Sequence, residues 1–425
     1  MTPDEKTIPQ GPFKFTGTHS GSAASEPGPA PNQARPKLTV DRSSELRLVG
    51  SPVAANRLLS LDAFRGLVII VMFLVNVGGT DPAMPAWFPH RGWANGEMGN
   101  GLADLVFPCF LFIVGVSVPF SMAGGRGRSL TVGRRVTAAF IRGLKIYLLG
   151  TLVWCATMAY TSPIDLTVFK HWDILPLIGF AYFTCVLLSL APRWVQALFV
   201  AAVLIFKWAI LTAVPLPAEG KVVWTQTASY QSYINSSLGW WGVLITQGLA
   251  AAATAQLGSL AGGRLLTGST TGLRREQCKH LLIVGAVTLT ASYVWHRFGG
   301  LPYSKDFFTS SYILCAAGVS GLVLGLMMYV IDIRNITTMR FLRVLGTNAL
   351  AMYILAELLW KCAMMKWKMV TPGGGESILV ASLKAWAQHA LGSPELGTWL
   401  FVICYIMFYW LIAAALYKRG WFIKV

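Results

Sequence analysis

His90 is the side chain in this sequence best suited to proton transfer or acyl transfer. It lies in a segment rich in Trp, Asn and Gly, between two long apolar runs. An imidazole titrates near neutral pH, so it can accept a proton and return it, or attack an acyl carbon as a nucleophile. A loop histidine is also a common surface residue. The pattern alone therefore makes His90 a candidate for catalysis and leaves the plain surface interpretation open.

Three polar or aromatic residues near His90 are candidates for the same site. Asn76 ends the first apolar run, and its amide can donate a hydrogen bond to a carbonyl oxygen on which charge develops. Trp93 follows in the same loop, and Asp104 opens the second apolar run. We predict that both contact a substrate. An acidic residue at a helix start can instead act only as a favourable charge against the helix dipole.

A second group of charged residues lies at the start of the first apolar run. Asp62 and Arg65 are three residues apart, so they share one helical face and can pair. Charges within a membrane span cost about 2.5 to 3.5 kcal/mol each, so such a pair calls for an explanation. One interpretation is a self-neutralised pair with Arg65 reaching towards lipid phosphates. The other is a site for an anionic ligand, to which Arg57 also contributes.

Asn348 and Glu357 are the polar residues of a later apolar run. They are nine residues apart, which places them on nearly opposite sides of one helix. Both are candidates for substrate contacts, with interhelical hydrogen bonding as the alternative for Glu357. Lys207 is isolated in an apolar run, and its pattern indicates no role. The seven cysteines form no CxxC pair, so we predict packing roles and no metal site.

The elements that position these residues are long apolar helices. Only 12% of the residues are charged and 54% are hydrophobic, which excludes a soluble nucleic-acid-binding protein despite the net charge of +17. The apolar runs are longer than the strands of an outer-membrane barrel. We therefore predict an all-α polytopic membrane protein with about ten transmembrane helices in one bundle. The expected spans are 60–79, 103–122, 138–158, 172–190, 195–214, 238–260, 280–296, 311–332, 343–363 and 397–417.

The basic residues predict the orientation of the bundle. With both termini in the cytoplasm, 25 of the 35 Lys and Arg residues fall on the cytoplasmic side, as the positive-inside rule requires. The loop 80–102 is then outside. Residues 1–55 are rich in Pro, Gly, Ser and Ala and lack the apolar core of a signal peptide, so we expect a disordered cytoplasmic tail before a membrane domain at 56–425. The predicted location is the plasma membrane, or the inner membrane of a bacterium.

Two motifs give the sequence a family resemblance. The run RLLSLDAFRG at 57–66, followed by Asn76, His90, Trp93 and ADLVFPCFLFIVG at 103–115, resembles the heparan-α-glucosaminide N-acetyltransferase family of membrane acyltransferases. The resemblance extends over 57–425 and includes the stretch GTNALAMYILAELLW. It implies transfer of an acetyl group from cytosolic acetyl-CoA to an amino sugar on the far side of the membrane. It also implies that His90 is the active-site histidine and that Asn76 is the helix-end asparagine of the family.

The charge count and the resemblance agree on the path of the acetyl group. His90 is expected outside, whereas coenzyme A is kept inside, so the acetyl group must pass through the bundle, with Asp62, Arg65 and Arg57 at the inner mouth. His90 acts either as a general base or through an acetyl-histidine. A secondary transporter or a non-catalytic protein that binds a sugar or a lipid head group remains an alternative. The expected partners are acetyl-CoA, a sugar-type acceptor and the lipid bilayer, without nucleic acid; the choice between monomer and homodimer stays open.

Overall fold

The structure is a computed structural model. It describes residues 58–78, 81, 84–85, 87–90, 101–124, 127, 129–158, 172–217, 219–223, 225, 228–266 and 271–423. The chain divides at Gly50 into two units, and the described residues all belong to the second. The predicted tail, Arg57 and Trp93 lie outside the described residues.

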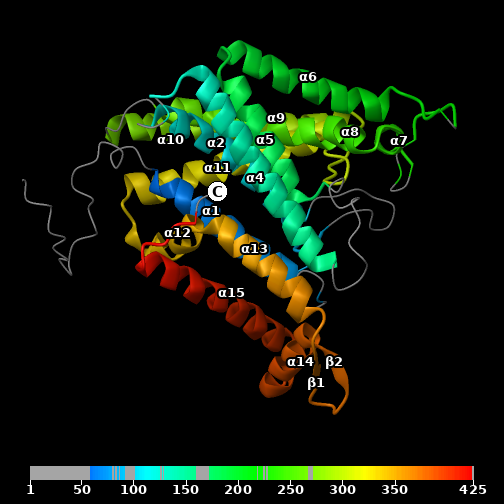
Figure 1. Ribbon diagram of the computed structural model, residues 1–425, viewed down its shortest axis with the longest axis vertical. Helices are drawn as coiled ribbons and strands as arrows, with labels where there is room; N and C mark the ends of the chain where they lie inside the picture. Colours follow the sequence, from blue (N-terminus) through cyan, green and yellow to red (C-terminus); the bar gives the residue numbers. More distant parts are fainter. Residues whose placement is uncertain are drawn as a thin grey trace, which may run out of the picture. The chain divides into compact units, whose positions relative to one another are not determined.

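The described part of the chain is almost entirely helical (Figure 1). Its first elements are α1 (Leu59–Gly78), α2 (Leu102–Ala123), α4 (Val132–Met158), α5 (Ile174–Ser189), α6 (Arg193–Thr212), α7 (Tyr230–Leu238), α8 (Trp240–Val243), the π-helix η3 (Leu244–Gly248) and α9 (Leu249–Leu265). They are followed by α10 (Thr271–Phe298), α11 (Ser310–Met327), η4 (Met328–Ile333), η5 (Thr337–Met339), α12 (Arg340–Thr347), α13 (Ala349–Leu359), η6 (Trp360–Met364), β1 (Lys368–Val370), β2 (Glu376–Ile378), α14 (Leu379–Leu391) and α15 (Pro394–Lys418).

These helices confirm a polytopic all-α membrane protein. Within the described ranges, eight helices are long and apolar enough to span a bilayer, and the bent pair α12–α13 with η6 makes a ninth. The remaining expected span, 172–190, corresponds to α5, which has only 16 residues and is shorter than a usual span. All ten expected runs therefore fall on helices, and their ends differ from the expectation by several residues.

α1 lies at the centre of the packing and α10 at its periphery. About two-thirds of the α1 span is buried, compared with 22% of the α10 span. Glycines allow α1 and α12 to approach backbone to backbone. A Cβ built at Gly66 would lie 1.8 Å from the carbonyl oxygen of Leu342, and one built at Gly346 would lie 1.7 Å from that of Asp62. This crossing fixes the helix that carries Asp62, Arg65 and Asn76.

The run predicted as one helix over 343–363 is broken at Asn348. α12 and α13 meet there at an angle of 74°. The buried Asn348 amide donates to the carbonyl oxygen of Trp421 at 3.1 Å and accepts from the backbone N–H of Ile423 at 2.9 Å. Asn348 therefore anchors the end of the chain at the bend. The prediction of one continuous helix over 343–363 was wrong, because the helix breaks at Asn348, which lies at the junction of α12 and α13, whereas Glu357 lies within α13.

A small substructure follows η6 that the apolar runs did not predict. Strands β1 and β2 pair antiparallel, with Met369 opposite Ser377. α14 packs against both strands and against α15, and Figure 1 shows these elements together beyond the ends of α13 and α15. Trp386 of α14 donates its indole N–H to the carbonyl oxygen of Val370 at 2.8 Å. The hairpin and α14 therefore form one cap at that end of the bundle.

The structure gives Lys207, whose sequence context indicated no role, a set of buried hydrogen bonds. Its side chain is fully buried in α6, and its ammonium donates to Oε1 of Gln231 and to the carbonyl oxygen of Thr246 at 3.2 Å. Thr246 lies in the π-helix η3, where a widened turn makes backbone carbonyls accessible to side-chain donors. Lys207 thus joins α6 to α7 and η3.

Candidate functional site

The segment that carries His90 is hydrogen-bonded to the start of α2. The backbone N–H groups of Leu102 and Ala103 donate to the carbonyl oxygens of Trp87 and Phe88, at 2.8 and 3.1 Å. These amides belong to the first turn of a helix, which has no partners for them within the helix itself. The pairing holds residues 87–90 beside the helix start, so His90 is positioned by α2. We call this end of the bundle, where α1 ends and α2 begins, the His90 end.

His90 and Asp104 form a hydrogen-bonded pair. Nδ1 of His90 lies 2.6 Å from Oδ1 of Asp104, and the other carboxylate oxygen accepts from the backbone N–H of Gly101 at 2.8 Å. An ionised carboxylate only accepts, so Nδ1 carries the hydrogen and Nε2 keeps its lone pair in the neutral imidazole. The Asp104 side chain is 4% exposed, whereas that of His90 is 55% exposed. This arrangement holds one nitrogen and presents the other to a reactant.

The loop between α10 and α11 completes the surroundings of Asp104. Tyr312, at the start of α11, donates its hydroxyl to the carbonyl oxygen of Asp104. Lys305 of this loop lies in the electrostatic field of Asp104, Asp306 and Asp173. Burial lowers the pKa of Lys305, and the three carboxylates act in the opposite direction. The site therefore contains a cation that the sequence pattern did not single out.

Asn76 lies near the end of α1, as predicted, and its side chain is exposed. Within the described residues it forms no hydrogen bond with His90 or Asp104. Its role in catalysis remains a prediction, as does that of Trp93. The structure thus joins His90 to Asp104 and leaves Asn76 available at the same end of the bundle.

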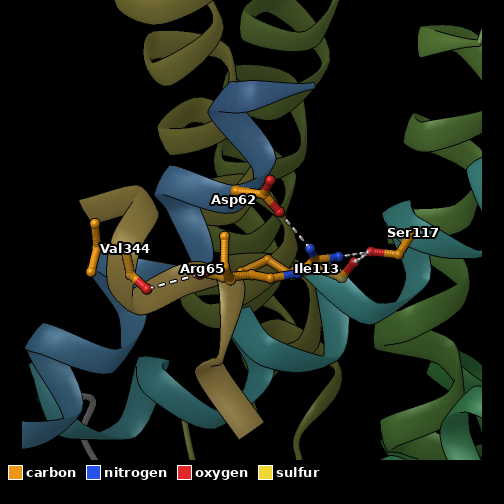
Figure 2. Close-up of polar contacts among 6 residues, drawn as sticks. Asp62, Arg65, Ile113, Ser117 and Val344 are labelled. Carbon is orange, nitrogen blue, oxygen red and sulfur yellow. Dashed lines mark hydrogen bonds and ion pairs between the residues drawn. The ribbon is translucent and has the colours of Figure 1, made fainter. Parts of the chain in front are cut away.

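The second predicted group lies towards the other end of α1, which we call the Arg65 end. The guanidinium of Arg65 lies 3.0 Å from Oδ1 of Asp62, which confirms the predicted pair. Another guanidinium nitrogen donates to the hydroxyl of Ser117 on α2, and that hydroxyl donates to the carbonyl oxygen of Ile113 at 2.7 Å (Figure 2). The Arg65 side chain is 28% exposed and that of Asp62 is 8% exposed. Arg65 is therefore held by α1 and α2 with part of its side chain accessible.

Glu357 forms a local ion pair. Its carboxylate lies 3.1 Å from the ammonium of Lys361, one helical turn later in η6. The same ammonium lies 5.6 Å from the ring centroid of Trp154 on α4. Glu357 thus faces the contact between α13 and α4, away from the helix bend at Asn348. Substrate contact by either residue remains a prediction.

A comparison with known families assigns the chain. Residues 57–298 match the family profile described as heparan-alpha-glucosaminide N-acetyltransferase, catalytic. The match covers more than half of the chain and includes α1, α2, His90, Asp104 and Arg65. The chain belongs to this family. The resemblance drawn from the two motifs is therefore confirmed.

Two curated relatives carry the same family name. The chain is 33% identical over 175 residues to heparan-alpha-glucosaminide N-acetyltransferase of Mus musculus, over 38% of this chain and 22% of the relative. It is 34% identical over 149 residues to the Homo sapiens protein of that name, over 32% of this chain and 19% of the relative. The aligned segments span about a fifth of the length of these relatives.

Three residues near the predicted site residues were not singled out by the sequence. Ser117 lies in an apolar run where a serine is unremarkable, and Tyr312 and Lys305 are more than 200 residues from Asp104. Helix packing brings all three to residues that the sequence had singled out. The sequence did contain one signal, the acidic residue Asp104 at the start of α2. It was interpreted as a substrate contact or as a charge against the helix dipole. In the structure, Asp104 is hydrogen-bonded to His90.

Proposed function

We propose that this protein is a membrane N-acetyltransferase that uses acetyl-CoA and acetylates the amine of an amino sugar or related glycan. The observation that supports this function best is the His90–Asp104 pair, located within the matched segment of an N-acetyltransferase family. A carboxylate that holds Nδ1 leaves Nε2 of a neutral imidazole free to accept a proton or attack a carbonyl carbon.

Two reaction paths suit this pair. In direct transfer, the amine attacks the thioester carbonyl while Nε2 of His90 takes its proton. The carbon–sulfur bond then breaks, and the leaving thiolate receives that proton. In the two-step path, Nε2 itself attacks the carbonyl carbon, the carbon–sulfur bond breaks, and coenzyme A leaves as the thiolate while the acetylated ring keeps the hydrogen on Nδ1. The amine then attacks the acetyl carbon, the bond from that carbon to Nε2 breaks, and the proton released by the amine balances the thiolate, which becomes the thiol. Asn76 is our candidate donor to the oxyanion in either path.

The Arg65 end is our proposed binding site for acetyl-CoA. Coenzyme A is a polyanion, and a planar guanidinium binds phosphate oxygens through charge-assisted hydrogen bonds. Arg65 is partly exposed, and the crossing of α1 with α12 brings the basic helix that contains Arg340 and Arg343 against it. Arg57 and Asp62 belong to the same proposed site. The donor set therefore suits a phosphate-rich ligand.

The proposed topology places the Arg65 end in the cytoplasm and the His90 end outside, so the acetyl group crosses the bundle. In a variant without the native cysteines, an impermeant maleimide added to intact cells should label Trp87→Cys, because Trp87 is 57% exposed at the His90 end. Ile336→Cys, between η4 and η5, should react only after permeabilisation. The reverse pattern would exclude this orientation.

Acetyl transfer itself is tested with purified protein, labelled acetyl-CoA and a panel of amino sugars. We expect an N-acetylated product that forms at a rate proportional to the protein. Protein labelled without an acceptor would indicate the two-step path. Absence of transfer to every amine, with acetyl-CoA binding retained, would contradict the enzyme assignment.

A second candidate function, transport, is favoured by one observation. The α12–α13 helix pair is broken at Asn348, and discontinuous helices often line the substrate sites of transporters. In reconstituted vesicles, a transporter would accumulate the unmodified labelled sugar. An acetyltransferase would yield acetylated sugar without such accumulation.

A further inference from the structure

The cap formed by the hairpin and α14 carries an exposed apolar patch, which we define as Trp367, Val370 and Trp386. These side chains are 63%, 51% and 43% exposed. Trp386 and Val370 are neighbours, because the indole N–H of Trp386 donates to the carbonyl oxygen of Val370. The exposed Lys366 adjoins the patch. Tryptophan and lysine are typical of chain segments at the surface of a bilayer, where an apolar stem or ring is buried and the polar end stays wet.

The helix α15 fixes the depth of α14 in the membrane. It ends at Lys418, whose ammonium suits lipid headgroups. A helix needs about 20 residues to cross the hydrocarbon layer, so counting back from Lys418 places the opposite edge of that layer close to Gly397. A Cβ built at Gly397 would lie 2.3 Å from the Cα of Gln388, so α14 and α15 meet there backbone to backbone. α14 therefore lies at the edge of the hydrocarbon layer.

The helix that leads into the hairpin gives the same depth. Asn348 precedes this helix and is hydrogen-bonded to Trp421 and Ile423, just beyond the end of α15. From there α13 and η6 run over Ala349–Met364 and rise about 24 Å, at about 1.5 Å per residue. The hydrocarbon layer is about 30 Å thick, and a tilt of the helix shortens the rise further. Trp367 and the hairpin therefore begin at the headgroup level and not in bulk water.

The hairpin cannot lie deeper than the headgroup layer. A two-stranded sheet leaves backbone N–H and C=O groups at both edges, and such groups are not tolerated in contact with hydrocarbon. α14 satisfies two carbonyl oxygens of β1, since Ser382 donates to that of Met369 at 2.8 Å and Trp386 donates to that of Val370 at 2.8 Å. In the headgroup layer, water and polar lipid groups reach the edges of the sheet.

The two depths and the composition of the patch agree on one partner, the surface of the bilayer. We propose that the cap is an interfacial anchor, whose patch is seated among the lipid headgroups on the His90 side of the membrane. Lys384 of α14 pairs with Asp81, at the start of the segment that carries His90. The anchor thus holds the start of that segment at a fixed height above the hydrocarbon layer. This anchoring requires a membrane-spanning bundle and does not require acetyl transfer.

The depth of the patch is measured with a nitroxide label at Val370→Cys, in protein that lacks the native cysteines and is reconstituted into phosphatidylcholine vesicles. Power saturation by oxygen, which concentrates in hydrocarbon, and by a water-soluble nickel chelate gives the distance of the label from the phosphate level. We expect the label to lie between that level and about 10 Å below it. Ile403→Cys, on the exposed face of α15, is the reference for hydrocarbon, and Lys221→Cys, in an exposed loop, is the reference for water.

The role of the indole rings is tested by Trp367→Ser in the same labelled protein. The label at Val370→Cys should move towards water, because the substitution removes the ring that favours the interface. Trp194→Ser is the matched control, since Trp194 is equally exposed but lies at the start of α6, and it should leave the depth of the label unchanged. An unchanged depth in Trp367→Ser would show that the patch does not hold the cap, and would overturn the proposal.

A label at Val370→Cys that is as accessible to the nickel chelate as the label at Lys221→Cys would also overturn the proposal. Two further readouts would then identify the real occupant of the patch. Spectral broadening that disappears when labelled protein is diluted with unlabelled protein would indicate a second copy of the chain. Loss of nickel accessibility on addition of glucosamine oligosaccharides would indicate a glycan.

Discussion

Lys384 of α14 forms a 2.9 Å ion pair with Asp81, which lies 303 residues earlier in the chain. The Asp81 carboxylate also accepts from the hydroxyl of Thr398 at 3.2 Å. The side chains are 17% and 10% exposed, so the pair is mostly removed from solvent. Asp81 begins the segment that carries His90. The C-terminal cap formed by the hairpin and α14 therefore holds the near end of that segment, while α2 holds the far end.

Lys384→Met should loosen this segment. The substitution keeps the apolar stem and removes the ammonium that donates to the Asp81 carboxylate, which costs about 1 to 3 kcal/mol for a poorly solvated charge. We expect a lower unfolding temperature in detergent and a reduced kcat for acetyl transfer. Lys368→Met, at an exposed position of β1, should change neither quantity. Equal effects of the two substitutions would show that the ion pair has no special role.

Asp104→Asn should reduce acetyl transfer by about 10²- to 10⁴-fold, as should His90→Ala. The asparagine keeps the size of the side chain. Its amide can donate as well as accept a hydrogen bond, so it no longer fixes the tautomer of the imidazole as the carboxylate does. Because the two residues act as one unit, the double variant should be no slower than His90→Ala alone. Rates are measured at saturating acetyl-CoA, with folding checked by thermal unfolding.

The control for the pair is Glu219→Gln, which removes a partly exposed carboxylate of another loop and should leave the rate unchanged. Retention of more than about a tenth of the wild-type rate by folded His90→Ala would rule out general-base catalysis by this residue. Additive losses in the double variant would show that Asp104 acts independently of His90.

The membrane architecture was predictable because it depends on local composition. A run of about 20 apolar residues has few alternatives to a helix in a bilayer, so every expected run coincides with a helix. The break at Asn348 was not predictable from the run, since the run contains no proline, its glycine Gly346 packs against α1, and the bend carries hydrogen bonds to Trp421 and Ile423. The hairpin and α14 were not predicted, because they are shorter and more polar than the apolar runs on which the prediction was based.

Only the contacts between residues close in the sequence were predictable. Asp62 and Arg65 are three residues apart, and helical geometry alone brings them together. His90 and Asp104 are separated by a loop, so their contact depends on the pairing of residues 87 and 88 with the start of α2. Lys305, in the loop before α11, and Lys384, on α14, come from distant parts of the chain, and the order in which the helices pack is not encoded in either local sequence.

Gly346→Ala should separate α1 from α12. The new Cβ would lie 1.7 Å from the backbone carbonyl oxygen of Asp62, which no side-chain rotation can relieve. We expect destabilisation of about 1 to 3 kcal/mol or more from the forced displacement. Gly133→Ala in α4 is the control, because nothing lies within 4 Å of its Cβ and alanine favours a helix. Thermal unfolding compares the two; equal stability would mean that the α1–α12 crossing is loose.

Arg65→Ala should weaken acetyl-CoA binding more than it lowers stability. The guanidinium is held by Asp62 and Ser117, and it remains 28% exposed at the proposed phosphate site. Loss of one charge-assisted hydrogen bond to a phosphate costs about 1.5 to 3 kcal/mol, which corresponds to a rise in Kd of about 10- to 100-fold.

The binding measurement uses two ligands to separate the phosphate contact from folding. By calorimetry, Arg65→Ala should bind acetyl-CoA less tightly than the wild type does. It should bind S-acetylpantetheine, which has no phosphate, as tightly as the wild type does. Arg193→Ala, at an exposed arginine that begins α6, should leave the affinity for both ligands unchanged. If Arg65→Ala is poorly folded yet binds acetyl-CoA normally, the Asp62–Arg65 pair is structural and the nucleotide binds elsewhere. Equal losses for both ligands would indicate distortion of α1, because loss of a phosphate contact cannot weaken the binding of a thioester that has no phosphate.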